Sequence, residues 1–381
     1  MPLHLDILDV GQGDGMLLWL PNGKMMMIDL GSTKNKGVVT EDAFKYFKDH
    51  TPFKDEGCPL EWLVLTHGDR DHYNMVEEFL RRFKPSLRNV LHGGLESDYG
   101  GLIGRLRNRE NPDKTYPTIY TGINTFWNKL GDADTLGAEV VALACGVQPA
   151  GGNNGYVKNT RSVVLRIFYK GIALVLTGDA TRDTEFAIIG YVSSTLKLNP
   201  REVLASNVLK VAHHGSHRTS NHAAWIFLVD PNYAFVSSDR SGSLDPDQKA
   251  TGHRLPQMLT IDLLRTYGKR MIRNCATHSY VSSYQRSDYV AYNLNPDVTG
   301  QPLPIPTNPN EDEWIQASSE DGIFSTLAVM GTSIDEDDPG AADQGVQYRV
   351  TIGDDGSFDI YSTLDDFKDF KKLSPSKSSV A

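Results

Sequence analysis

Short apolar runs separated by turn-forming residues dominate residues 3–240 of the chain. Near the N-terminus, runs at 3–10, 16–20 and 25–30 are divided by a glycine-rich segment and by Pro21-Asn22-Gly23-Lys24, a pattern that predicts three successive strands. Further runs of strand length are found at 62–66, 139–144, 162–169, 172–177, 203–212 and 233–238. The glycine-rich segment 11–15 looks like a phosphate-binding loop, but it lies between two strands, so a tight hairpin is favoured.

Apolar residues recur at helical spacing between these strands. The segments with this spacing are 40–49, 71–83, 185–192 and 223–228. Strands interspersed with helices predict an α/β (α+β) fold of two mixed β-layers with helices outside them. Residues 95–135 are irregular and rich in Gly, Asn, Asp and Arg, so this segment is interpreted either as one wall of a substrate pocket or as a surface elaboration.

The pattern changes in the C-terminal third. Residues 296–345 are rich in Pro, Asp, Glu and Gly, whereas the runs at 348–352 and 357–361 flank Gly-Asp-Asp-Gly, a hairpin signal. We therefore predict a main domain over 1–285, a C-terminal extension with a β-hairpin over 286–370, and a disordered tail over 371–381. The acidic extension is a candidate contact surface for a protein partner.

Composition limits the class of protein. Hydrophobic residues make up 39% and charged residues 23% of 381 residues, which is typical of a soluble globular protein. No run reaches membrane-spanning length, no secretory segment is visible at the N-terminus, and three scattered cysteines predict no disulfide framework, so we expect a cytoplasmic protein with no membrane contact. A formal net charge of −10 argues mildly against a tight duplex binder.

Residues 66–72 carry the strongest chemical signal. They read Thr-His-Gly-Asp-Arg-Asp-His directly after an apolar run, and so place His67, Asp69, Asp71 and His72 where a strand gives way to a turn. Imidazoles and carboxylates crowded in this way are the ligands that divalent metals share. A solvated charged turn is the alternative interpretation of this segment taken alone.

Distant segments supply further ligands of the same kind. The apolar runs at 25–30, 172–177 and 203–212 lead into Asp29, Asp179 and His213-His214 respectively. Strands that each finish on Asp or His, and that continue into glycine-containing loops, converge at one edge of a sheet, where α/β proteins collect catalytic groups. A strand that ends in Asp-Gly is often only turn chemistry, but four such ends together favour a metal site.

These segments resemble the metallo-β-lactamase fold superfamily. Its His-x-His-x-Asp-His signature is matched by residues 67–72, with Asp69 in the second His position. The segments Leu8-Asp9-Val10-Gly11-Gln12-Gly13-Asp14, Asn159-Thr160-Arg161-Ser162, Thr177-Gly178-Asp179 and His213-His214-Gly215-Ser216 are similar to the hydrolase domain of bacterial DNA-uptake (competence) channel proteins. The resemblance covers residues 3–240 and implies an αββα sandwich with a two-metal hydrolytic site.

The resemblance also implies roles for individual residues. One metal would bind His67 and Asp69, a second would bind Asp71, His72 and His214, and Asp179 would bridge them. Asp71 would also be catalytic, His213 a proton donor or an orienting residue, and Asp29 a residue that orients a ligand. No histidine matches the third family motif, where Asn159 lies instead. Tentative substrate contacts near the double histidine are Lys210, Ser216, His217 and Arg218.

Two divalent ions, zinc or manganese, are the expected cofactors. Carboxylate at Asp69 and amide at Asn159 are harder ligands than imidazole, which favours Mn²⁺ over Zn²⁺. A centre of this kind suits phosphodiester hydrolysis, so we expect a phosphodiesterase or nuclease acting on nucleic acid. The alternatives are a hydrolase of a small ester, thioester or cyclic nucleotide, and a binding or scaffold module with a degenerate metal site.

Overall fold

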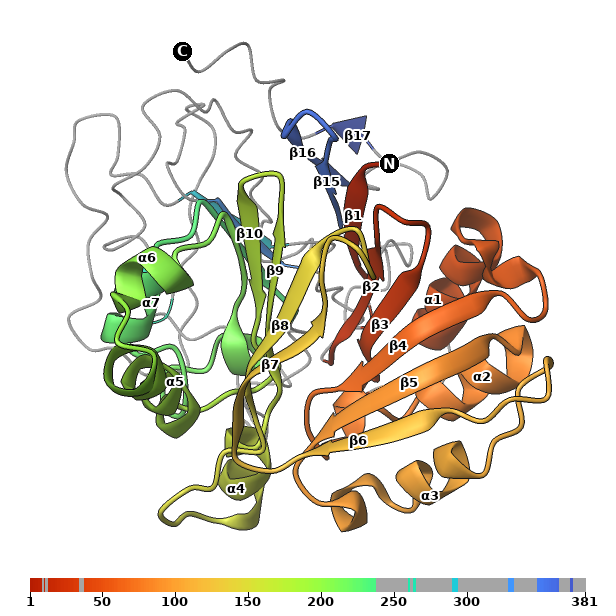
Figure 1. Ribbon diagram of the computed structural model, residues 1–381, viewed down its shortest axis with the longest axis horizontal. Coiled ribbons are helices and arrows are strands. Elements are labelled where there is room, and N and C mark those ends of the chain that lie inside the picture. Colours follow the sequence, from red (N-terminus) through yellow and green to blue (C-terminus); the bar gives the residue numbers. More distant parts are fainter. Residues whose placement is uncertain are drawn as a thin grey trace, which may run out of the picture.

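The computed structural model describes residues 1–8, 10, 13–33, 38–237, 260, 263–264, 290–293, 328–331, 348–362 and 371–372. Asp9, Gly11 and Gln12 of the predicted hairpin turn, and most of the predicted extension, lie outside the described residues. The described part of the chain folds into two β-sheets that face each other, with helices on both outer sides (Figure 1).

The first sheet combines an antiparallel meander with parallel strands. Its order is β17 (Lys371–Lys372), β16 (Phe358–Ser362), β15 (Tyr348–Ile352), β1 (Leu3–Ile7), β2 (Gly15–Trp19), β3 (Met25–Leu30), β4 (Pro59–Leu65), β5 (Ser86–Gly93) and β6 (Thr118–Gly122). Strands β1 to β3 run antiparallel, and β3 to β6 run parallel. The carboxyl ends of β3 and β4 therefore meet at one edge.

The second sheet has the same combination. Its order is β13 (Val290–Asn293), β14 (Ala328–Gly331), β12 (Tyr233–Val236), β11 (Val208–Lys210), β10 (Ile172–Leu176), β9 (Val164–Tyr169), β8 (Glu139–Cys145) and β7 (Thr125–Gly131). Strands β10, β11 and β12 run parallel, so that their carboxyl ends share an edge.

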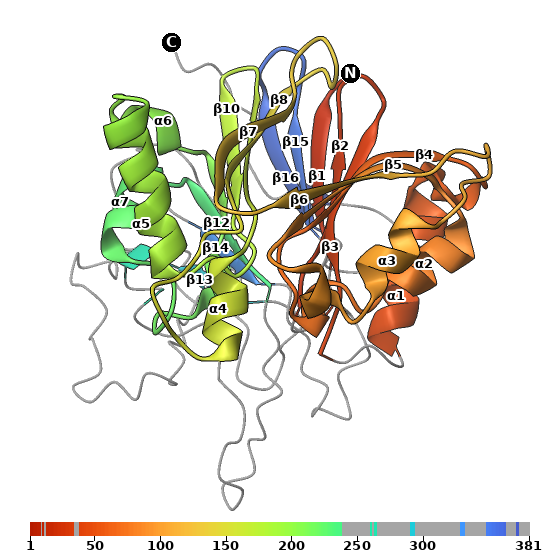
Figure 2. The same ribbon diagram turned by 60° about the horizontal axis from the view of Figure 1, so that its bottom comes forward.

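Helices cover the outer face of each sheet. The helices against the first sheet are α1 (Val38–His50), α2 (Val76–Phe83) and α3 (Leu102–Arg107). Those against the second sheet are α5 (Arg182–Gly190), α6 (Pro200–Leu204) and α7 (Ala223–Val229). Helix α4 (Asn154–Thr160) lies at the lower end of the view in Figure 2. Single turns of 3₁₀ helix occupy Pro52–Lys54, Arg70–His72, Glu96–Tyr99 and Ala212–Gly215, and Tyr191–Thr195 forms a π-helical turn after α5.

Three apolar layers hold this arrangement together. In β3, Met26 and Ile28 face the other sheet, whereas Met25 and Met27 face the helices, because side chains alternate along a strand. A continuous apolar run such as β3 is what a strand covered on both faces requires. The fold is thus the predicted αββα sandwich, with its cores between the sheets and beneath each helical layer.

Several predicted boundaries are wrong. The helix expected over 71–83 begins only at Val76, because Arg70–His72 turns tightly to present its side chains. The segment 95–135 is not irregular, since it contains α3, β6 and β7. The strand expected over 203–212 is only β11, because Pro200–Leu204 forms α6 and residues 212–215 turn.

The predicted C-terminal hairpin is present as β15 and β16, and it joins the first sheet rather than standing apart. Strand β15 pairs antiparallel with β1, and β16 pairs with β17 at Lys371–Lys372, so the segment expected to be a disordered tail starts with two paired residues. The rest of that tail and the predicted boundary at 285 lie outside the described residues.

A buried ion pair fastens β15 to β1. The carboxylate of Asp6, which is fully buried, accepts hydrogen bonds from Arg349 at 2.5 Å to Nε and from Trp19 Nε1 at 2.7 Å. The hydroxyl of Tyr46 on α1 donates to the same carboxylate. Asp6 thus links the N-terminal meander, the first helix and the C-terminal hairpin.

We expect Arg349→Met to lower the free energy of unfolding by about 2–4 kcal/mol, because it leaves the buried charge of Asp6 without its cation. Urea unfolding followed by tryptophan fluorescence measures this. Arg81→Met is the control, since Arg81 pairs with Glu78 on the surface and such pairs contribute less than about 1 kcal/mol. Equal effects of the two changes would contradict a structural role for the Asp6 network.

Candidate metal centre

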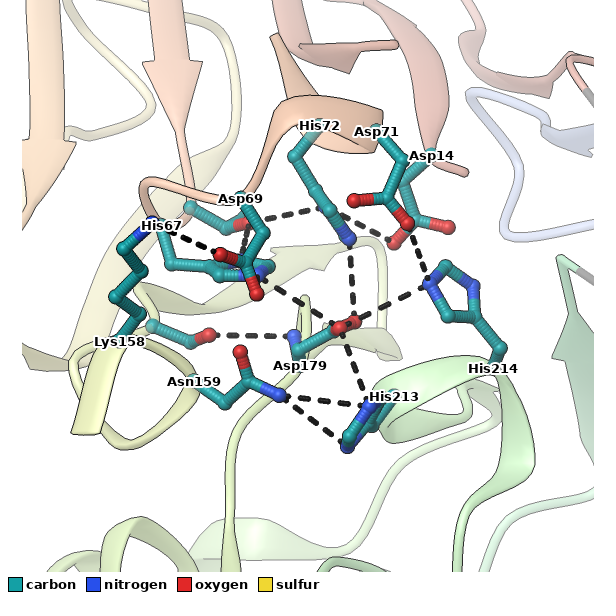
Figure 3. A network of polar contacts seen from close by, with 12 residues as sticks. Asp14, His67, Asp69, Asp71, His72, Lys158, Asn159, Asp179, His213 and His214 are labelled. Atoms are coloured by element: carbon teal, nitrogen blue, oxygen red, sulfur yellow. Dashed lines mark hydrogen bonds and ion pairs between the residues drawn. The ribbon is translucent and has the colours of Figure 1, made fainter. Parts of the chain in front are cut away.

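The carboxyl ends of strands from both sheets bring the candidate ligands together. Asp29 lies in β3, and residues 67–72 follow β4. From the opposite sheet, Asp179 follows β10, and His213 and His214 follow β11. Parallel pairing within each sheet aligns these ends, and the two groups face each other across the gap between the sheets (Figure 3).

Asp179 lies at the centre of this cluster. Its carboxylate is surrounded by the Nε2 atoms of four histidines, at 3.3 Å from His72, 3.7 Å from His67, 3.7 Å from His214 and 3.8 Å from His213. Ligand atoms about 2.1 Å from one tetrahedral ion lie about 3.4 Å apart, so these spacings are those of groups that share a cation.

Asp71, His72 and His214 form the more complete ligand group. His214 Nε2 lies 3.4 Å from Asp71 Oδ2, and one ligand atom from each of the three residues lies within 4.8 Å of the others. Three buried atoms beside this group, His72 Nε2, His214 Nε2 and Asp179 Oδ1, have no hydrogen-bond partner. Buried polar atoms without partners are rare in native proteins, and these three converge on one point, so the donor set fits a divalent cation.

Outer partners hold both imidazoles in the orientation that this group needs. His72 Nδ1 lies 2.8 Å from Asp29 Oδ2, and His214 Nδ1 lies 2.6 Å from the carbonyl oxygen of Ser237. A histidine whose Nδ1 is held in this way presents its Nε2 to a metal. Asp29 is itself fixed, because its carboxylate accepts hydrogen bonds from the backbone and hydroxyl of Thr66.

The backbone is strained at these positions. Positive φ angles of 55°, 50° and 50° occur at Asp29, His213 and His214. Residues other than glycine rarely adopt this backbone conformation. Each costs about 1–3 kcal/mol, and such residues cluster at functional sites. Gly13 packs so closely that a Cβ there would lie 2.6 Å from the carbonyl oxygen of Asp71, which keeps the N-terminal loop against the motif.

His67 and Asp69 form a second, different group. His67 Nε2 lies 3.7 Å from Asp69 Oδ2, but Asp69 also faces two residues of α4, Lys158 and Asn159. Lys158 Nζ lies 3.2 Å from Oδ1. The amide of Asn159 lies between Asp69 and His213 (Figure 3), and turning its nitrogen toward Asp69 gives 3.0 Å to Oδ2.

The electrostatics of the cluster are those of a site that attracts cations. Burial raises the pKa of Asp179, but the surrounding histidines lower it by more than burial raises it. The pKa of Asp179 therefore lies well below the ordinary value. Burial likewise raises the pKa of Asp71, whereas the His214 imidazole 3.4 Å away lowers it, to about 2. Burial lowers the pKa of His72, and the carboxylates of Asp179 and Asp29 raise it well above the ordinary value. Both carboxylates are therefore charged at neutral pH.

Comparison with known proteins agrees with this geometry. The sequence model of the metallo-β-lactamase superfamily matches residues 8–236. The chain belongs to the metallo-β-lactamase superfamily.

The curated relatives of this superfamily member are named for recombination and competence. Recombination protein 2 of Haemophilus influenzae is 27% identical over 239 residues, which is 62% of this chain and 24% of the relative. ComE operon protein 3 of Bacillus subtilis is 25% identical over 309 residues, which is 76% of this chain and 36% of the relative. The chain thus spans about a quarter to a third of the length of these relatives.

Similarity to solved structures is limited. The short form of human tRNase Z is 11% identical, with a TM-score of 0.39 over 60% of this chain and 90% of that one. The metallo-β-lactamase fold protein YhfI from Bacillus subtilis is also 11% identical, with a TM-score of 0.37 over 61% of this chain and 84% of that one.

One tentative substrate contact is wrong. Lys210 is fully buried, and its ammonium lies 2.8 Å from Asp14 Oδ1, so it does not reach a substrate phosphate. Ser216 is also buried and accepts a hydrogen bond from Thr219. His217 is half-buried and Arg218 is exposed, so their predicted substrate contacts stay predictions.

Two residues of the cluster were missed by sequence reasoning. Asp14 is buried 3.9 Å from His72, and the glycine-rich segment that carries it reads as an ordinary turn. Lys158 lies on a short polar helix with no pattern that marks it. Residues 95–135 supply α3, whose Arg105 lines a pocket with Arg70 and Tyr73 near the motif.

Among the described residues, no helix has both the length and the apolar character needed to cross a membrane.

We expect Lys210→Met to act on stability, because it leaves Asp14 charged and buried between the sheets. Removal of one partner of a buried pair costs about 3–5 kcal/mol, which urea unfolding measures. Lys129→Met, which removes an exposed lysine paired with Asp132, is the matched control with little expected change. Unchanged stability together with a raised KM would restore Lys210 as a substrate contact.

Proposed function

We propose that this protein is a metal-dependent phosphodiesterase that acts on nucleic acid. The observation that carries the proposal is the convergence of His72 Nε2, His214 Nε2 and Asp179 Oδ1, three buried atoms without hydrogen-bond partners, at the edge shared by both sheets. A scaffold module with a degenerate site has no need of such costly unsatisfied groups.

Asp71, His72, His214 and Asp179 would hold a divalent ion in this group, and His67 and Asp69 form the candidate group for a second. A divalent ion bound there lowers the pKa of a water molecule and neutralises charge that develops on a phosphoryl oxygen. Of the two candidate metals, the carboxylate-rich donor set favours Mn²⁺ over Zn²⁺.

In the proposed reaction, a water oxygen forms a bond to phosphorus while the bond from phosphorus to the leaving oxygen breaks. Asp71, itself a member of the ligand group, is the candidate that accepts the proton that the water loses in this step. His213 is the candidate that transfers a proton to the leaving oxygen, because its Nδ1 is held 2.7 Å from Thr219 Oγ1 and its Nε2 faces Asp179. Its side chain is 24% exposed, so it borders the space that a substrate can reach.

Cations beside the motif support a phosphate-bearing substrate. Burial raises the pKa of the Tyr73 hydroxyl above its ordinary value, although the charges of Lys158, Arg70 and Arg105 act in the opposite direction. Three cations therefore lie near this phenol. Arg70, Tyr73 and Arg105 line a pocket of about 360 Å³ that begins at the motif itself. Arg70 is exposed and has no ion pair with any residue that the structure describes.

Nucleic acid is favoured over a small ester, thioester or cyclic nucleotide for a separate reason. The relatives in Haemophilus influenzae and Bacillus subtilis are named for recombination and for the ComE operon, and recombination is a reaction of DNA. The local cations provide phosphate contacts that the overall net charge of −10 does not.

The central test is hydrolysis with added Mn²⁺ or Zn²⁺ of single-stranded DNA, duplex DNA, RNA and a chromogenic phosphodiester. We expect activity on nucleic acid, higher with Mn²⁺, and a loss of at least about a hundredfold in Asp71→Ala and in His72→Ala. Activity that survives both changes would come from a contaminant. Hydrolysis of the chromogenic compound alone would favour the small-substrate alternative.

Arg70→Met should raise KM for an oligonucleotide several-fold, because it removes a phosphate-binding charge while the ligand group stays intact. It should leave kcat within about twofold and should weaken the dependence of KM on salt. Arg81→Met, which removes an exposed arginine outside this pocket, is the control. A fall in kcat with unchanged KM would place Arg70 in the chemistry instead.

A further inference from the structure

The two ligand groups differ in how their polar atoms are satisfied. The three atoms named above, His72 Nε2, His214 Nε2 and Asp179 Oδ1, lie beside the Asp71, His72 and His214 group. The other carboxylate, Asp69, already has Lys158 on one oxygen, and Asn159 on the other when its amide nitrogen is turned toward it. Among the described residues, the groups of potential ligands within mutual reach place His67 with His72 and Asp179, and Asp71 with His72 and His214, but none of them includes Asp69. One half of the cluster therefore fits an ion, and the other half is already occupied by a side chain.

That side chain belongs to Lys158. From the last turn of α4 its ammonium contacts Asp69 Oδ1 and the carbonyl oxygen of Gly68, each at 3.2 Å. Its side chain is 21% exposed, so the charge is partly removed from water and bound at two points of the motif. The adjacent Asn159 reaches the second oxygen of Asp69 when its amide nitrogen is turned toward it. Figure 3 shows Lys158 and Asn159 approaching Asp69 from the same helix.

We propose that Lys158 takes the place of a metal ion at the His67 and Asp69 group, so that the centre binds a single divalent ion tightly. The proposal rests on the proposed metal centre and revises its expected number of ions from two to one. Two physical reasons support it. An ammonium in contact with Asp69 repels a dication at the same carboxylate. Asp69 would also have to exchange its hydrogen bond from Lys158 for the metal bond.

The ammonium of Lys158 provides a positive charge where a second metal ion would have supplied one. Lys158 lies near Tyr73 and the pocket lined by Arg70, so its ammonium extends the row of cations toward the ligand group. In the hydrolysis proposed above, that ammonium would hold a non-bridging phosphoryl oxygen. A lysine binds phosphate as a point charge and donor, with no bond made or broken.

The test is the number of Mn²⁺ ions bound by the full chain. After removal of metals, the protein is dialysed against Mn²⁺ and analysed by mass spectrometry for ions per chain. Electron paramagnetic resonance distinguishes an isolated Mn²⁺ from an exchange-coupled pair. We expect one ion and an uncoupled spectrum in the wild type. In Lys158→Met we expect a second ion and a coupled spectrum, because His67 and Asp69 are then released.

Three further variants distinguish the effect of the Lys158 charge from an effect on folding. Lys158→Arg keeps the cation and should retain one ion, and Asp69→Asn placed on Lys158→Met should return the count to one. Lys129→Met removes an exposed lysine and aspartate pair away from the site, so it should leave the count at one. Circular dichroism checks that each variant is folded.

Each outcome has a defined meaning. Two ions in the wild type at similar affinity would overturn the role of Lys158 while the metal-dependent function stands. A single ion in both the wild type and Lys158→Met would also overturn it, since Lys158 would then exclude nothing. No bound ion in either protein would overturn the proposed metal centre itself.

Discussion

The carboxylate of Asp179 contacts histidines that follow strands of both sheets. It is the one acidic group of the second sheet within reach of His67 and His72 of the first, among the residues that the structure describes. A buried carboxylate is expensive unless cations or hydrogen bonds compensate it. The strained backbone at His213 and His214 is tolerated because it directs both imidazoles toward this charge. The function of the site therefore depends on how closely the two sheets are held together.

One buried ion pair maintains that closeness, and a second orders the first sheet. Lys210 of the second sheet reaches Asp14 beside the first, next to His72 of the ligand group. Arg349 reaches Asp6 and ties the C-terminal hairpin to the N-terminal strand. Such pairs add little net stability over apolar packing, but they penalise any arrangement that separates the partners. The geometry of the cluster is thus specified by charge pairing as well as by the apolar layer between the sheets.

Much of the architecture could be predicted because its signals are local. Alternation and run length identify strands such as β3 and β4, and strands that end in Asp or His indicate a shared edge. The ends of the helices were less predictable. At Asp71 the apolar spacing predicts a helix, but residues 70–72 form a separate turn and the helix begins at Val76. The role expected for Lys210 was wrong because its position next to the histidines says nothing about which way a strand residue faces.

By itself, the sequence determined the order of elements, the ligand types at 67–72 and their harder, carboxylate-rich character. Only the tertiary structure decided which charges those ligands meet. Lys158 and Asp69 are 89 residues apart, Lys210 and Asp14 are 196 apart, and Arg349 and Asp6 are 343 apart. Periodicity acts over a few residues, whereas these contacts depend on how the two sheets pack. The motif alone therefore does not indicate that the fold brings a lysine beside Asp69.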